Sequence, residues 1–101
     1  MRVIFEDVVR PPIEITANTT LSTLHWGRDL RVTTAATLTI PSGLPIGFEC
    51  AVMKDVADVV NFDVAAVTAK GDTVVSTQNG WAAVKGLATD TYALVGDLEA
   101  P

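Results

Sequence analysis

The sequence has very few of the residues on which most catalytic and metal sites depend. It contains one cysteine and one histidine among 101 residues. The single cysteine, Cys50, excludes an internal disulfide and a cysteine-rich zinc site. The single histidine, His25, stands beside Trp26 and Gly27 with no partner at metal-ligand spacing. We interpret Cys50 as a small buried hydrophobe and His25 as a solvated turn residue, and we expect no metal ligand.

Basic residues are also few, with seven lysines and arginines against twelve acids and a net charge of −5. Only Arg28 and Arg31 lie close together, whereas binding of nucleic-acid phosphates needs clustered positive charge. We therefore expect no nucleic-acid partner. No apolar run approaches the roughly 18 residues of a membrane helix, so we expect no membrane partner. Glu6 and Asp7 interrupt the region that a signal peptide would need to be apolar, which predicts synthesis and retention in a cytosol.

Motifs for catalysis or cofactor binding are missing as well. None of the serines has the strand, G-x-S-x-G and helix context of a nucleophile elbow. The glycine-bearing segment 43–47 lacks the Lys-Ser/Thr pair of a phosphate loop. Asp55, Asp58 and Asp63 are close in sequence, but we interpret them as solvated residues that flank a hairpin. The sequence predicts no catalytic and no cofactor-binding residue, and hence no enzyme.

Valine, threonine and alanine dominate the chain, and the β-branched residues favour strands. Apolar residues alternate with others in six segments, and turn signals such as Pro41-Ser42-Gly43 and Asn79-Gly80 separate them. We expect strands near residues 13–16, 29–33, 36–40, 48–55, 59–66, 73–76, 81–85 and 91–97. Strands of this length and spacing predict an all-β fold, a single small antiparallel sandwich or barrel-like domain. No internal repeat is evident.

The segment that precedes Pro11-Pro12 differs from the rest and predicts an N-terminal arm over residues 1–12. The β domain then covers 13–98, and 99–101 form a short tail. The arm carries two apolar runs, Val3-Ile4-Phe5 and Val8-Val9, ahead of a stiff double proline. In a monomer it would be an edge strand; in an assembly it would pair with a neighbouring subunit by strand addition.

Hydrophobic residues make up 49% of this short chain, more than one small core needs. We therefore expect a homotrimer or another symmetric oligomer. Trp26 and Trp81 both stand next to a glycine. Either tryptophan can pack in the fold, contact a neighbouring subunit together with Val3, Ile4, Phe5, Val8 and Val9, or stack on a sugar.

An ordered series of turns and strands runs through the chain: Gly27-Arg28-Asp29-Leu30, Leu38-Thr39-Ile40-Pro41, Gly43-Leu44-Pro45-Ile46-Gly47-Phe48, Val60-Asn61-Phe62 and Tyr92-Ala93-Leu94-Val95-Gly96-Asp97-Leu98. This series resembles a small β domain of tailed-phage virion proteins, found in capsid decoration proteins and in tail fibre and spike modules. The resemblance covers roughly residues 13–98. It implies a non-enzymatic virion component, made in the host bacterial cytoplasm, that associates with itself and with coat or other virion proteins.

Two functions follow from the resemblance. The first is a capsid decoration or cement protein that stabilises the shell. The alternative is a tail fibre or baseplate tip module that binds a host surface receptor or glycan. We expect the first because this chain begins at its own Met1 and the domain fills it.

Overall fold

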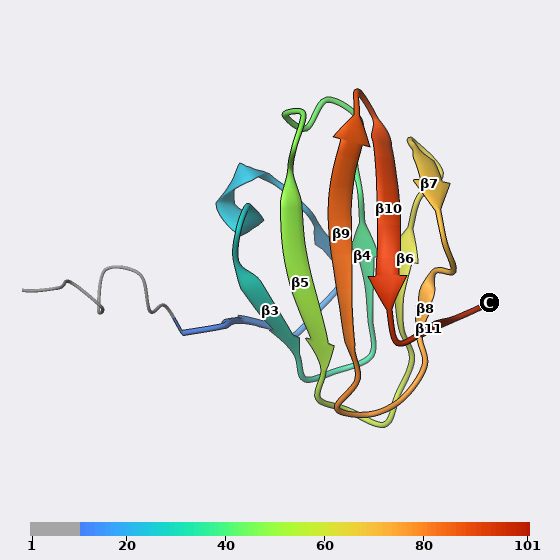
Figure 1. Ribbon diagram of the computed structural model, residues 1–101. Coiled ribbons are helices and arrows are strands. Elements are labelled where there is room, and N and C mark those ends of the chain that lie inside the picture. Colours follow the sequence, from blue (N-terminus) through green and yellow to red (C-terminus); the bar gives the residue numbers. More distant parts are fainter. Residues whose placement is uncertain (1–10) are drawn as a thin grey trace, which may run out of the picture.

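The computed structural model describes residues 11–101, and these are built almost entirely of strands (Figure 1). The strands are β1 (Ile13–Ile15), β2 (Thr19–Thr20), β3 (Asp29–Val32), β4 (Ala36–Thr39), β5 (Glu49–Lys54), β6 (Val60–Asp63), β7 (Thr68–Lys70), β8 (Val74–Val75), β9 (Trp81–Ala88), β10 (Thr91–Gly96) and β11 (Leu98–Glu99). One 3-10 turn, η1, covers Thr23–His25. The all-β class is confirmed, and a strand lies in each of the eight predicted segments. Strands β2, β7 and β11 were not predicted.

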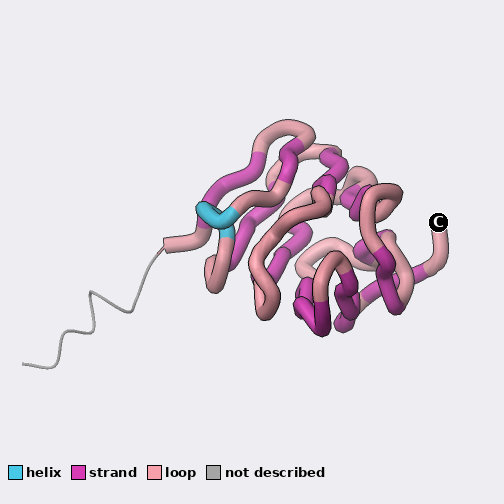
Figure 2. The backbone as a smooth tube through the Cα atoms, turned by 90° about the horizontal axis from the view of Figure 1, so that it is seen from above, coloured by secondary structure: helices cyan, strands magenta, loops and turns pink. Residues whose placement is uncertain are grey.

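The strands form two stacked sheets. Sheet A has the order β1-β3-β5-β9-β10-β7, and sheet B has the order β11-β8-β6-β4-β2. The first six strands alternate between the sheets. Two consecutive strands, such as β1 in sheet A and β2 in sheet B, therefore make one coil of the chain. Within sheet A the coils stack in parallel, with Ile13 opposite Leu30 and Leu30 opposite Val52. Figure 2 shows the chain winding between the two layers.

The expected antiparallel sandwich or barrel is therefore wrong: the fold is a β-solenoid. Residues 33–35, between β3 and β4, are few enough to suggest a hairpin, but they carry the chain from sheet A to sheet B. The hairpin expected around Asp55 and Asp58 is likewise a crossing from β5 in sheet A to β6 in sheet B. Antiparallel pairing is confined to contacts of β9, β10, β8 and β11, as in the β9–β10 hairpin.

The core lies between the sheets and is filled by alternate residues of each strand. Leu30 and Val32 of β3, for example, are fully buried, while Asp29 and Arg31 point outward. Fully buried side chains are Leu21, Leu30, Val32, Leu38, Ile40, Phe48, Val52, Val60, Val75, Val84 and Tyr92. In the six segments where the sequence shows alternation, which became β1, β3, β4, β5, β6 and β10, the period-two pattern thus predicted correctly which face is buried.

Lys54 is the buried charged residue among those that the structure describes. It occupies an inward position at the end of β5, and its Nζ donates to the carbonyl oxygen of Val75 in sheet B at 3.4 Å. The backbone of Lys54 also bonds the turn that precedes β9. Its N–H donates to the carbonyl oxygen of Gly80, and its own carbonyl oxygen accepts the N–H of Asn79. Lys54 therefore ties the two sheets together at one end of the core.

The described part of the chain begins at Pro11, two residues before β1. The carbonyl oxygen of Pro11 accepts a hydrogen bond from the Arg28 guanidinium at 3.1 Å. Residues 1–10, which make up most of the arm expected over 1–12, lie outside the described residues. At the other terminus, Glu99 pairs with Val74 in sheet B, although the sequence placed it in the tail.

Candidate functional site

His25 is not the solvated turn residue that we expected. It ends η1 half-buried, and its Nδ1 accepts the backbone N–H of Ser22 at 2.9 Å. The Ser22 hydroxyl accepts the N–H of Leu24 in return. This reciprocal arrangement is a capping box in which the imidazole takes the place usually held by Glu or Gln. The His25 side chain therefore has a structural role, which is to cap the backbone at the start of η1.

Cys50 is buried, as predicted. Burial raises the pKa of its thiol from 9.0 to about 12, and the neighbouring Glu49 carboxylate adds to the rise. Because the thiolate is the reactive form of cysteine, this side chain is inert at neutral pH.

The raised pKa predicts a specific pH dependence of stability. A thiol that holds its proton more tightly in the folded state stabilises the fold below pH 9.0, and this contribution is lost as the pH rises toward 12. Each pH unit in that window costs up to about 1.4 kcal/mol. Urea unfolding between about pH 8 and pH 10.5 should show a steeper loss of stability for the wild type than for Cys50→Ala. Parallel slopes for the two proteins would contradict this account of Cys50.

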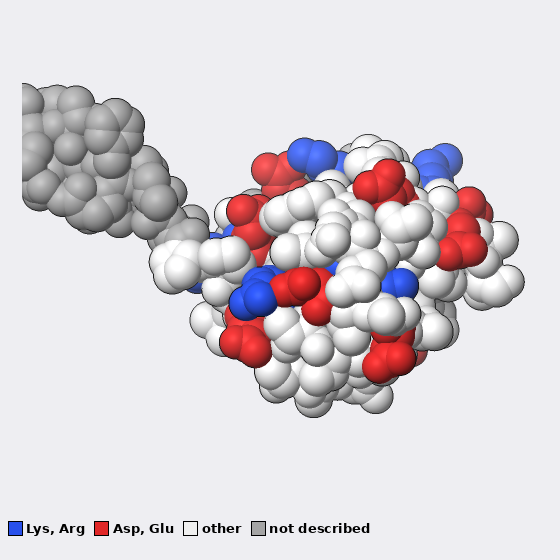
Figure 3. Space-filling model, turned by 90° about the horizontal axis from the view of Figure 1, so that it is seen from below, with Lys and Arg blue, Asp and Glu red and all other residues white. Residues whose placement is uncertain are grey.

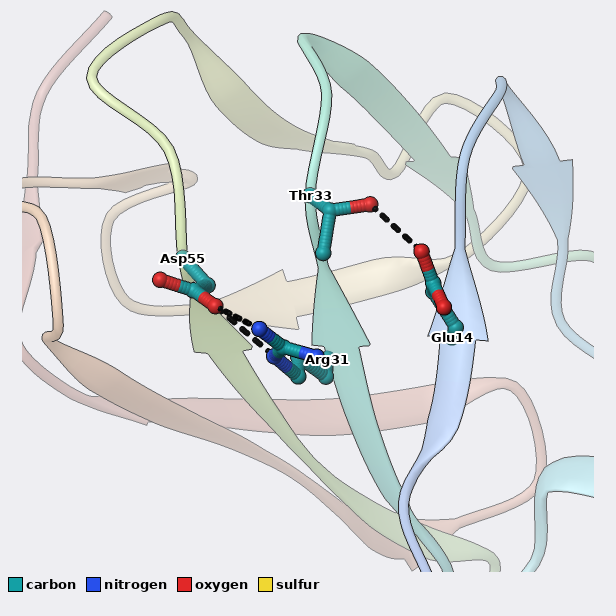
Figure 4. Close-up of polar contacts among 4 residues, drawn as sticks. All are labelled: Glu14, Arg31, Thr33 and Asp55. Carbon is teal, nitrogen blue, oxygen red and sulfur yellow. Dashed lines mark hydrogen bonds and ion pairs between the residues drawn. The ribbon is translucent and has the colours of Figure 1, made fainter.

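The acidic side chains are engaged in separate surface contacts. Arg31 Nε donates to Asp55 Oδ2 at 2.7 Å, and Thr33 Oγ1 donates to Glu14 Oε2 at 3.2 Å (Figure 4). Asp63 accepts the N–H of Ala65 within its own turn. Within residues 11–101, no three His, Cys, Asp or Glu side chains come together in a group that could hold a metal ion. Asp55, Asp58 and Asp63, which are close in sequence, therefore do not form a common metal site.

The outer face of sheet A carries an apolar strip, which we define as Ala51, Met53, Trp81, Ala83 and Val95. Their proximity follows from the strand register: Ala51 pairs with Ala83, Met53 with Trp81, and Ala83 with Val95. Trp81 and Val95 remain 46% and 47% exposed. An ion pair between Lys85 and Glu49, with 2.9 Å between Nζ and Oε2, lies beside the strip in the next row. The Arg31–Asp55 pair flanks it on the other side.

A hollow of about 140 Å³ opens within this face. Its lining includes the small residues Ala51 and Ala83 and the larger Asp29, Glu49 and Lys85. The two alanines are cross-strand partners, so two adjacent positions of the face lack long side chains. The hollow is therefore the gap that two alanines leave between taller neighbours.

A second apolar surface, which we call the loop-end patch, consists of the exposed side chains of Leu24, Trp26, Ile46 and Leu87. The β4–β5 connection, which contains Ile46, and the end of β9, which contains Leu87, lie at the upper end of the molecule in Figure 1. The Trp26 ring packs on buried Phe48, with 6.3 Å between ring centroids. The Phe48 carbonyl accepts the N–H of Gly86 at 2.7 Å, which brings the segment before Leu87 to the same place. Leu24 is 79% and Ile46 68% exposed, so this end presents large apolar side chains from η1, the β4–β5 connection and the end of β9.

The predicted interface residues thus fall into three places. Val3, Ile4, Phe5, Val8 and Val9 lie outside the described residues. Trp26 belongs to the loop-end patch. Trp81 belongs to the strip and lies near the lower end of β9 in Figure 1, so the two tryptophans do not share a site. The hollow was missed because small residues in a strand give no signal until their cross-strand partners are known.

Charges are dispersed over the face drawn in Figure 3. Figure 3 shows acidic and basic groups interspersed on a largely uncharged face, without a basic stripe. Within the described part of the chain, no helix has the length and apolar character needed to cross a membrane. The chain matches no family model, no curated protein and no solved structure.

Proposed function

We propose that this chain is a non-enzymatic structural protein of a phage virion, and specifically a capsid decoration protein that stabilises the shell as a symmetric oligomer. The observation that carries the proposal is the apolar strip on sheet A. A sheet face with exposed Trp81 and Val95 beside small alanines suits contact with another protein surface. The resemblance of residues 13–98 to phage virion domains is the reason for proposing a phage virion as the place where the chain acts.

The chemistry of the described side chains supports a structural role. His25 completes the capping box of η1, and Cys50 is held as a neutral thiol. The surface carboxylates of Asp55 and Glu49 are both in ion pairs. These groups contribute to folding and surface contacts, as expected for a protein whose task is to bind and brace rather than to transform a substrate.

Heat challenge of particles tests this proposal. Phage that lack the gene should assemble but lose their DNA at a lower temperature than wild-type phage, because the coat loses its bracing contacts. Added purified protein should bind the deficient particles and restore their heat resistance. Deficient particles with unchanged heat resistance would contradict a decoration role.

The loop-end patch favours a second candidate function, a tail fibre or baseplate tip that binds the host surface. In the part of the chain that the structure describes, Leu24, Ile46 and Leu87 are exposed near Trp26 and form an apolar surface. Adsorption to host cells separates the two functions. Under the tip function, Ile46→Glu should reduce adsorption without affecting particle heat resistance; under the decoration function it should leave adsorption unchanged.

A further inference from the structure

The sheet A face carries both a projecting aromatic side chain and a hollow. Trp81 and Ala83 lie two residues apart on β9, so their side chains point to the same side of the sheet. Trp81 is 46% exposed, and the alanine pair Ala51–Ala83 forms part of the hollow's lining. The same face therefore carries a projecting side chain, Trp81, which we call the knob, and the hollow beside Ala83, which we call the hole. The two are one row of cross-strand pairs apart.

We infer that Trp81 of one copy of the chain fills the hollow of a second copy, and that the second copy's Trp81 fills the first hollow in return. This inference rests on the proposed function, because it names the contact by which the chain forms a symmetric oligomer. A patch that contains both the knob and the hole is complementary to itself. Self-complementary patches meet across a two-fold axis, so the contact predicts a dimer, whereas composition alone suggested a trimer.

The size of the hollow suits an aromatic ring. A cavity of about 150 Å³ in a protein interior is known to accept benzene. That cavity is apolar. The hollow here has a similar volume of about 140 Å³ and opens to the surface, and its lining combines Ala51 and Ala83 with the charged Arg28, Asp29, Glu49 and Lys85. The ring of a partner can therefore enter from outside and lie on the alanines. A tryptophan seated in such a pocket is the kind of residue that dominates the binding energy of an interface.

The borders of the hollow are compatible with a face-to-face contact. Glu49 and Lys85 are already paired within one chain, and so are Arg31 and Asp55. The lining of the hollow holds two bases, Arg28 and Lys85, and two acids, Asp29 and Glu49, so a second copy meets a border without net charge. Met53 and Val95 extend the apolar area beside the tryptophan.

Sedimentation velocity over a range of protein concentrations tests the inference with three variants of the full chain. Trp81→Ala removes the knob, and Ala83→Leu fills the hole. Trp26→Ala is the matched control, because it removes the other exposed tryptophan from the loop-end patch. Far-UV circular dichroism and urea unfolding of each variant show whether it is folded.

We expect the wild type and Trp26→Ala to form dimers. Trp81→Ala and Ala83→Leu should each raise the dimer dissociation constant by about thirtyfold or more, the effect of losing an interface hot spot. A wild-type dimer that both substitutions leave intact would overturn the inference but leave the proposed function standing. A dimer weakened by Trp81→Ala alone would also overturn it, because the hollow would then not be the receptor.

A wild-type trimer would exclude the two-fold contact while keeping a symmetric oligomer. A wild-type monomer at micromolar concentration would remove both the contact and the oligomer on which the proposed function depends. The outcomes for the inference and for the function are thus distinguishable.

Discussion

Replacement of Phe48 by alanine is expected to lower the free energy of unfolding by about 3 to 5 kcal/mol. Phe48 is fully buried where the β4–β5 connection enters sheet A. Its ring supports Trp26, and its backbone bonds both Pro45 and Gly86. Removal of the ring leaves a cavity beneath the loop-end patch that the rigid β-sheet cannot close.

Urea unfolding monitored by circular dichroism measures this loss. Ile46→Ala is the matched control, because Ile46 is two residues away but 68% exposed. The control should change stability by less than about 1 kcal/mol. Equal losses for the two variants would show that Phe48 is not the anchor of this end.

Gly96→Ala is expected to lower the free energy of unfolding by about 3 kcal/mol or more. Gly96 ends β10 with a φ of +117°, a conformation that residues with a side chain rarely adopt. An added Cβ would also lie inside the van der Waals distance of the Trp81 carbonyl oxygen. That oxygen accepts the N–H of Asp97 at 2.8 Å, so it cannot move away without breaking the crossing from sheet A to β11.

Gly43→Ala separates the two causes. Gly43 has a φ of +86°, but an added Cβ would meet no atom within 4 Å. Its substitution should therefore cost only the backbone strain, about 1 kcal/mol. Thermal unfolding followed by calorimetry compares the two variants, and an equal cost for both would mean that the contact with Trp81 is unimportant.

The positions and buried faces of the strands were predictable because they depend on short-range alternation. Leu30 and Val32, or Tyr92 and Leu94, have the same period whatever strand lies beside them. The direction of pairing was not predictable from that pattern. The coils also differ in length: residues 13, 30 and 52 are stacked partners, which gives spacings of 17 and 22. With unequal coils, a solenoid leaves no repeat in the sequence.

The candidate surfaces were predictable only in part. Trp81 stood out as a tryptophan beside a glycine, but its neighbours on the strip come from β5 and β10, whose register no local pattern specifies. The capping role of His25 was missed for a different reason. An imidazole seldom replaces Glu or Gln in a capping box, so Ser22 and His25 gave no recognisable signal.

The copy number of the chain in purified particles tests the central claim most directly. Quantitative mass spectrometry, with the major coat protein as internal reference, gives the number of chains per virion. A decoration protein repeated over the symmetric shell should be present in hundreds of copies. The absence of the chain from purified particles would contradict the account, and a handful of copies would replace the capsid location with the tail.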